Sequence, residues 1–338
     1  MEQRIHFLDY LRAVSIFFII MIHVSAQNWY SSDIHSFAWQ TLNFYDCISR
    51  WSVPAFVMMS GALFLNKEIT ISQIYKKYIL RLVISFFIWS TFYCFWENKS
   101  FSLEKILNGK YHMWFIFMIT GLYMLLPILQ EIVRNKKMMS YFLLLAFIFT
   151  FCIPFVDKII HDFFKVPPIV SVINKKIQVM DIKLVLGYTG YFVLGYFLNS
   201  VDLTKKKRIA IYSGGIMGFL LTILLQTALV LKTQQHTQSY YGYLTLNVFL
   251  STVAVFVCFR NLKVFSKSNI IVQKLSKYSL GVYFVHVFIL NLLKDLGLNT
   301  LLFNPVLSVP LITMIIYCLS VCVIAVLHRI PILKKYIA

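Results

Sequence analysis

Residues 7–27 read FLDYLRAVSIFFIIMIHVSAQ, an apolar run with one arginine near its start and one histidine near its end. A helix needs about 20 mostly apolar residues to cross the roughly 30 Å hydrocarbon core of a bilayer. The run therefore predicts a transmembrane helix, and similar runs recur along the whole chain.

The whole sequence has the composition of a membrane protein. Of its 338 residues, 59% are hydrophobic and 13% are charged, which is more apolar than a soluble domain needs to fill its core. The apolar runs are continuous and do not alternate with period two, which favours helices over a barrel. We predict an all-α, polytopic integral membrane protein with about ten transmembrane helices. Their approximate bounds are 7–27, 42–66, 77–96, 112–131, 140–157, 183–200, 207–230, 241–260, 276–294 and 305–328.

The net charge of +19 would suit a nucleic-acid-binding protein, but the basic residues lie mainly in short segments between spans. If the N-terminus is cytoplasmic, 21 of the 32 Lys and Arg residues fall on the cytoplasmic side. The positive-inside rule therefore predicts that both termini are cytoplasmic. We expect the lipid bilayer, and no nucleic acid, as the partner of these charges. No polar segment exceeds about 26 residues, so residues 1–338 are expected to form one transmembrane domain without a separate soluble domain.

Two ionisable residues in the first span are functional candidates, because such groups inside a bilayer are unfavourable unless they are paired or hydrated. Arg12 and His23 are 11 residues apart, which corresponds to about three turns and about 16 Å along the axis, so they share one helix face. The alternatives are that Arg12 anchors the helix at the membrane surface or pairs with Asp9, and that His23 is hydrogen-bonded between helices.

A basic cluster, Lys76-Lys77-Tyr78-Ile79-Leu80-Arg81, opens the third span at the end assigned to the cytoplasm. Most such clusters are only orientation signals. If Arg12, Lys77 and Arg81 converge, however, they form a positively charged entrance suited to the phosphates of a nucleotide-like donor such as coenzyme A.

Further candidates lie deeper in the chain. His286 in the ninth span is roughly 15 Å from the cytoplasmic end, a depth comparable with that of His23. The outer segment, about 157–182, combines basic and aromatic side chains that suit either a sugar or lipid-carrier phosphate or anchoring at the interface. The basic and aromatic residues are Lys158, His161, Phe163, Phe164, Lys165, Lys175 and Lys176, and the segment also contains Pro167 and Pro168.

The six cysteines show no metal-ligand spacing with histidine, and no metal site is predicted. Cys47, Cys94 and Cys152 fall near outer ends of spans, where either a disulfide or simple packing is possible. Val24-Ser25-Ala26 weakly resembles a signal-peptidase site, but we expect the first span to be retained.

Several stretches together resemble the acyltransferase 3 family of membrane-bound surface-polysaccharide O-acyltransferases. They are Phe7-Leu8-Asp9-Tyr10-Leu11-Arg12-Ala13 through His23-Val24, Ser52-Val53-Pro54-Ala55-Phe56 with Ser60-Gly61, the basic entry to the third span, His112-Met113-Trp114-Phe115, Gly121-Leu122-Tyr123-Met124-Leu125-Leu126-Pro127, and Tyr278-Ser279-Leu280-Gly281-Val282-Tyr283 through His286. The resemblance covers most of the chain, which corresponds to the stand-alone form without an appended hydrolase-like domain. Two departures are Lys77, where arginine is frequent, and Ser85, where many members have proline.

The resemblance implies a reaction and roles for these residues. Acyl-CoA, most simply acetyl-CoA, would be the donor substrate, with no permanently bound cofactor, and a surface polysaccharide or lipid-linked glycan would be the acceptor. His23 and His286 would be catalytic, with His23 acting as a general base or as a transient acyl carrier. The donor would be bound by Arg12, Lys77 and Arg81. The acceptor would be contacted or oriented by His112, Trp114 and Tyr283.

Two other classes remain open on the residues alone. A transporter or flippase that exports a glycan would also use many spans with intramembrane histidines. A sensing or assembly partner of an envelope enzyme is the third class. The resemblance implies a location in the bacterial inner membrane, and the oligomeric state is left open.

Overall fold

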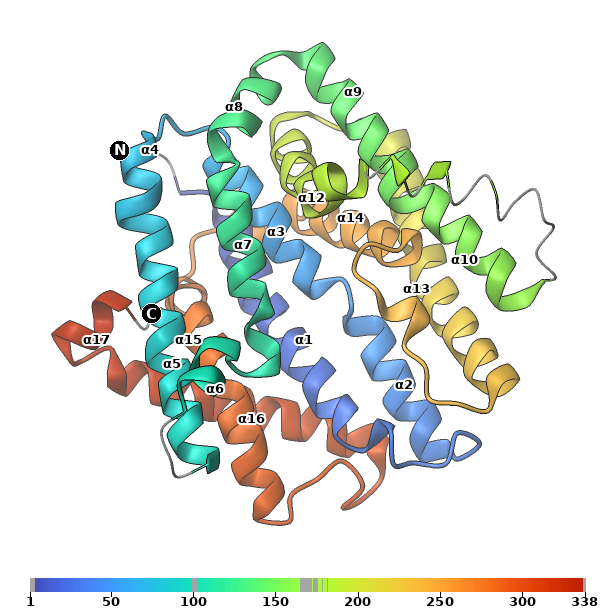
Figure 1. Ribbon diagram of the computed structural model, residues 1–338, viewed down its shortest axis with the longest axis vertical. Coiled ribbons are helices and arrows are strands. Elements are labelled where there is room, and N and C mark those ends of the chain that lie inside the picture. The colour runs from blue at the N-terminus through green and yellow to red at the C-terminus, as the bar shows by residue number, and fades with distance from the viewer. Residues whose placement is uncertain are drawn as a thin grey trace.

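The computed structural model describes residues 4–98, 102–164, 172, 176–177, 179–180 and 182–336. Helices make up 83% of the structure and the described residues contain no strand, which confirms the all-α prediction (Figure 1). In chain order the elements are α1 (His6–Trp29), α2 (Phe37–Ser49), α3 (Ser52–Phe64), α4 (Ile71–Gln73), η1 (Ile74–Ile79), α5 (Leu80–Asn98), α6 (Leu103–Asn108), η2 (Tyr111–Met113), α7 (Trp114–Met124), α8 (Leu126–Arg134), α9 (Lys136–Ala146), η3 (Phe147–Cys152), α10 (Ile153–Phe163), α12 (Ile182–Ser200), α13 (Lys205–Thr233), η4 (Ser239–Tyr241), α14 (Leu246–Asn261), η5 (Lys263–Ser266), α15 (Ile270–Asp295), α16 (Pro305–Leu327) and α17 (Pro331–Tyr336).

Within the described residues, eight helices are long and apolar enough to cross a membrane, and a bent pair raises the number to nine. The chain is therefore an integral membrane protein. The bent pair covers 111–134 and turns by 54°, with Pro127 in the first turn of α8. The remaining predicted span, 183–200, corresponds to α12, which is not among these candidates and is interrupted at Gly187 (φ −47°, ψ −111°). The number ten and the cytoplasmic termini stay predictions.

Prolines explain two further irregularities in the spans. The predicted span 42–66 is divided into α2 and α3 after Arg50, because Pro54 has no N–H to donate to the carbonyl at that position. In the same way Pro154 follows the π-helical segment η3. A second π-helical segment, η1, opens the third span and carries the predicted basic cluster; such segments often occur at functional sites.

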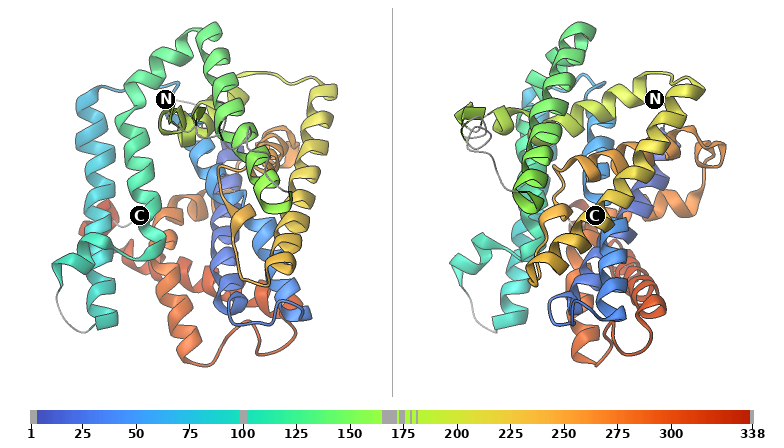
Figure 2. Two further views of the ribbon diagram at one scale, coloured as in Figure 1. Left: turned by 45° about the vertical axis from the view of Figure 1, so that its right-hand side comes forward. Right: turned by 90° about the vertical axis from the view of Figure 1, so that its right-hand side faces the viewer.

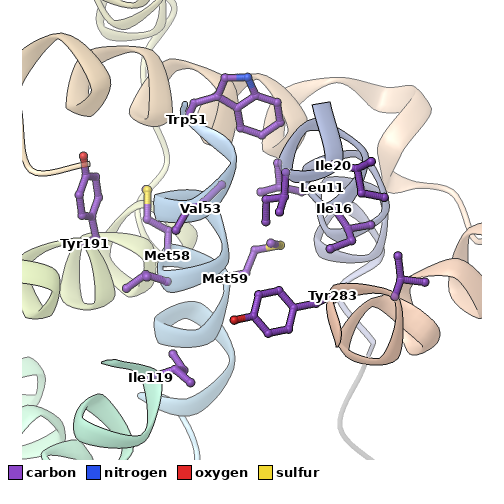
Figure 3. Close-up of a cluster of buried hydrophobic side chains, with 14 of the residues drawn as sticks. Leu11, Ile16, Ile20, Trp51, Val53, Met58, Met59, Ile119, Tyr191 and Tyr283 are labelled. Atoms are coloured by element: carbon purple, nitrogen blue, oxygen red, sulfur yellow. The ribbon is translucent and has the colours of Figure 1, made fainter. Parts of the chain in front are cut away.

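Helix α1 lies at the centre of the bundle and contacts α2, α3, α14, α15 and α16. In the most apolar stretch of α1, 67% of the residues are buried, whereas the corresponding share is 33% in α13 and in α16. Those two helices are therefore peripheral. Helix α5 stands at the edge opposite α13, with α7 beside it (Figure 2). Figure 3 shows the packing inside: Met58 lies on the side of α3 that faces α12, Tyr191 projects from α12, and Met59 and Tyr283 lie on the side of α3 that faces α1 and α15.

Helices α3 and α12 approach each other closely through two glycines. A Cβ atom added at Gly61 would lie 1.7 Å from the carbonyl oxygen of Phe192, and one added at Gly195 would lie 2.0 Å from that of Met58. Small residues permit this backbone contact. Inside a membrane the hydrophobic effect does not drive helices together, so the van der Waals packing of such a contact contributes to their association. The pair therefore fixes α3 against α12.

Replacing Gly61 with alanine should force α3 and α12 apart and lower stability by about 1–3 kcal/mol, the usual cost of overpacking. Gly121→Ala is the matched control, because nothing lies within 4 Å of an added Cβ there. Thermal unfolding of both purified variants in detergent measures the effect. Equal midpoints for the two variants would contradict the tight α3–α12 contact.

Candidate active site

A cavity of about 600 Å³ runs inside the helical bundle. Its walls come from α1, α3, η1, α5, η2, α7, α15 and α17, with further residues from the chain before α14 and between α16 and α17. On α1 the lining extends from Arg12 to His23, about 16 Å along the axis, so the cavity follows the helices. The lining residues are Arg12, Ile16, Ile19, Ile22, His23, Val53, Phe56, Ser60, Leu63, Phe64, Tyr78, Arg81, Leu82, His112, Trp114, Phe115, Ile116, Ile119, Tyr123, Tyr243, Ser276, Lys277, Ser279, Leu280, Tyr283, His328 and Lys334.

Three histidines from three helical segments meet at one end of the cavity. The ring centroid of His286 lies 5.1 Å from that of His23 and 5.2 Å from that of His112, while His23 and His112 are 6.4 Å apart. The hydroxyl of Tyr111 lies 3.4 Å from Nδ1 of His23. His23 and His112 line the cavity, so this cluster, here called the histidine end, can contact a bound molecule.

His286 lies behind the other two histidines and does not line the cavity. Its side chain is fully buried, and its Nδ1 is 2.7 Å from the carbonyl oxygen of Tyr283 and 3.2 Å from that of Val282. Carbonyl groups accept hydrogen bonds, so we assign the proton to Nδ1. Nε2 has no hydrogen-bond partner among the described residues. His286 can therefore act on a ligand only through its neighbours.

Aromatic side chains cover the wall beside the histidine end. The rings of Trp114 and Tyr243 are nearly parallel, with centroids 5.8 Å apart, and Tyr188 lies 6.0 Å from Trp114. The hydroxyl of Tyr283 donates a hydrogen bond to the backbone carbonyl of His112 at 2.5 Å. This bond holds α15 against the start of α7, and it leaves the Tyr283 ring facing the cavity.

Arg12 marks the opposite end of the cavity. Its Nη1 lies 3.5 Å from Oγ of Ser276, and it makes no ion pair within the described residues. Asp9, the alternative partner, is instead bound by Arg4 at 2.6 Å and by the Ser276 hydroxyl at 2.7 Å. The guanidinium of Arg12 is thus left to face the cavity.

Other cations gather at the Arg12 end, here called the cationic end. Arg81 lines it together with Lys277, His328 and Lys334, none of the last three having been selected from the sequence. Lys77 is exposed and does not line the cavity; its Nζ lies 5.4 Å from the ring centroid of Tyr78, which does. The structure therefore brings Arg12 and Arg81 together but not Lys77, whose role in donor binding stays a prediction.

A buried ion pair between Asp46 of α2 and Arg50, the residue that follows this helix, was not predicted from the sequence. Nε of Arg50 lies 2.5 Å from Oδ1 of Asp46, and both side chains are at least 90% buried. The guanidinium carbon of Arg50 lies 4.2 Å from the ring centroid of Tyr241 and 6.0 Å from that of Tyr243, which lines the cavity. Opposite charges four residues apart inside a predicted span were the available signal.

The remaining sequence candidates lie away from the cavity. In the outer segment, His161 pairs with Asp157 at 3.0 Å, and Lys158 lies 5.7 Å from the ring centroid of Tyr240. Lys165, Pro167, Pro168 and Lys175 are outside the described residues. All six cysteines are free thiols, so the possible disulfide does not form. No group of three His, Cys, Asp or Glu side chains in the described ranges has the geometry to hold a metal ion.

Comparison with known proteins decides the family. The sequence matches the acyltransferase 3 description, "Acyltransferase domain", over residues 5–329, nearly the whole chain. The chain belongs to the acyltransferase 3 family. It is therefore a membrane-bound acyltransferase, as the resemblance of its motifs predicted. Neither the curated proteins nor the solved structures contain a match to this acyltransferase.

Arg50→Ala should destabilise the acyltransferase by about 3–5 kcal/mol, because Asp46 is then left as an unpaired charge in the interior. The double variant Asp46→Leu, Arg50→Met removes both charges and should recover most of the loss. Thermal unfolding in detergent compares the two with the wild type. A single variant as stable as the wild type would show that the pair is not buried in the folded protein.

Proposed function

We propose that this protein transfers an acyl group, most simply acetyl, from cytoplasmic acyl-CoA to a hydroxyl of a cell-surface or lipid-linked glycan. The observation that carries the proposal is the single cavity that joins guanidinium groups at one end to a histidine cluster at the other. A donor that lies along it places its phosphates at the cationic end and its thioester near His23. Acyl-CoA has this arrangement of charge and reactive group.

The donor is held by electrostatic contacts at the cationic end. Arg12 and Arg81 supply planar guanidinium groups that match phosphate oxygens in bidentate fashion. Both interact electrostatically with Tyr123, which also lines the cavity. Between the two ends the walls are mainly apolar, with Ile16, Ile19 and Ile119 among them. An uncharged acyl arm suits this stretch.

His23 acts as the general base. With the Nδ1 proton donated to the Tyr111 hydroxyl, Nε2 is free to take the proton of an acceptor hydroxyl. The hydroxyl oxygen then bonds to the thioester carbonyl carbon, the C–S bond breaks, and the imidazolium returns its proton to the leaving CoA sulfur. His286 is a positioning residue, since its buried ring packs on both His23 and His112. Transient acylation of His23 itself is the alternative route.

The acceptor site is proposed beside the aromatic wall. Sugar rings stack on aromatic side chains through their apolar faces, and Trp114 with Tyr243 offers such a surface next to the histidines. His112 and Tyr283 flank this surface and are placed to orient the attacking hydroxyl. The proposed setting is the bacterial inner membrane, with the cationic end towards the cytoplasm, where acyl-CoA is made.

His23→Ala should lower transfer of radiolabelled acetyl from acetyl-CoA to envelope glycan by about 100- to 10,000-fold, the usual contribution of a general base. The assay uses membranes with matched protein levels, and His35→Ala, an exposed histidine, is the control. Full transfer by the His23 variant would overturn the assignment. Labelled protein that accumulates without acceptor would favour the acyl-carrier route, and no transfer by any form would favour export of a solute.

Arg12→Lys should raise the KM for acetyl-CoA by about tenfold, because lysine keeps the charge but loses the bidentate contact. The turnover number should change less, since Arg12 lies about 16 Å from His23 along α1. Arg134→Lys, at a surface pair with Glu131, is the control. Steady-state kinetics in detergent measures both constants. An unchanged KM in the Arg12 variant would remove it from donor binding.

A further inference from the structure

The cationic end holds more positive charge than Arg12 and Arg81 supply. Lys277, His328 and Lys334 also line it, and they come from α15, from the residue after α16 and from α17. None of the described residues that line the cavity is acidic. Four permanent cations therefore line one end of the cavity, and Asp9, which interacts electrostatically with Arg12, is itself paired with Arg4.

The C-terminal segment, residues 328–336, is fixed at this opening by specific contacts. The ring of His328 packs on Tyr278 of α15, with centroids 4.9 Å apart. At the other end of the segment, the hydroxyl of Ser85 on α5 forms a hydrogen bond to the carbonyl of Tyr336. The segment thus bridges α15 and α5 across the cationic end.

The charges lie close enough to affect each other. Burial, followed by the cations Lys277, Lys334 and Arg81, lowers the pKa of His328. His328 is consequently neutral near pH 7 and places no further charge among them. Three of these cations are exposed, so water screens their mutual repulsion, but together with Arg12 they make this end of the cavity attractive to an anion that carries several charges.

The cations differ in their burial. Arg12 is partly buried on the central helix, whereas Arg81, Lys277 and Lys334 are exposed, and of these three Arg81 interacts electrostatically with Tyr123, as Arg12 does. Coenzyme A carries a diphosphate near its middle and a 3′-phosphate on its ribose, at the end remote from the thiol. A donor with its thioester at the histidine end therefore reaches the two lysines with its 3′-phosphate.

We propose that Lys277 and Lys334 bind the 3′-phosphate of the acyl-CoA donor, so that the C-terminal segment completes the donor site. The inference rests on the proposed function and adds to it a specificity for the 3′-phosphate. Arg12 then contacts the diphosphate, together with Arg81, which interacts with the same tyrosine, Tyr123. The lysines act as point charges, which suits a terminal phosphate that is free to rotate.

The test compares acetyl-CoA with 3′-dephospho-acetyl-CoA as donors for the purified full-length protein. Lys277→Ala and Lys334→Ala should each raise the KM for acetyl-CoA about tenfold, the equivalent of one charged hydrogen bond. Turnover numbers and the KM for the dephospho donor should not change. Lys274→Ala is the matched control, an exposed lysine one turn away on α15 that does not line the cavity.

Three outcomes overturn the assignment. The first is an unchanged KM for acetyl-CoA in both lysine variants, and the second is an equal rise for both donors, which would mean that the lysines do not sense the 3′-phosphate. The third is an equal effect in Lys274→Ala, which would indicate general attraction by surface charge. Calorimetric measurement of CoA binding distinguishes a failure of the 3′-phosphate site from a failure of the proposed function. A wild-type protein that neither binds CoA nor transfers acetyl overturns the proposed function together with this site.

Discussion

A guanidinium group inside a bilayer is unfavourable unless water or a polar partner reaches it, and Arg12 lies on the central helix with Ser276 as its hydrogen-bond partner among the described residues. The cavity resolves this conflict, because it gives the charge an environment that a ligand or water can enter. The arrangement of helices around α1 follows from the same need. Helices α3, α5, α7 and α15 each present lining side chains to one space, and the helices furthest from it face lipid.

In the proposed function, this cavity separates donor binding from the chemical step. Positive side chains occupy one end, whereas histidines and aromatic rings occupy the other, and apolar walls lie between them. Hydrogen bonds to backbone carbonyls fix the parts of the histidine end: Tyr283 bonds the carbonyl of His112, and His286 bonds that of Tyr283. Catalysis requires such fixed positions, because a small displacement of a reacting group strongly lowers the rate of the reaction. The close contact of α3 with α12 supports this frame from the other side.

Local sequence patterns predicted the features that depend on a single helix, such as which residues share one of its faces. The 11-residue separation of Arg12 and His23 placed both on one face, and both line the cavity. Eight or nine of the predicted spans agree with helices that are long and apolar enough to cross a membrane, but the breaks at Pro54 and Pro127 and the interruption at Gly187 were not predicted.

Contacts between distant segments lay beyond sequence reasoning. Tyr111 meets His23 across 88 positions of the chain, and the C-terminal segment reaches α5 through Ser85. Neither has a local signal. Lys77 is a case in which a local pattern suggested a residue that the structure does not place in the cavity. It lies in the π-helical segment η1, where it is exposed, whereas its neighbour Tyr78 lines the cavity.

The central claim is that one transmembrane cavity connects a donor at the cationic end with an acceptor at the histidine end. Sealed, inside-out membrane vesicles test it most directly, with labelled acetyl-CoA added outside, at the face that was cytoplasmic, and acceptor glycan enclosed within. Label on the enclosed glycan, absent when acetyl-CoA is supplied only inside, is the predicted result. Label that appears only when donor and acceptor share one side of the membrane would contradict the account.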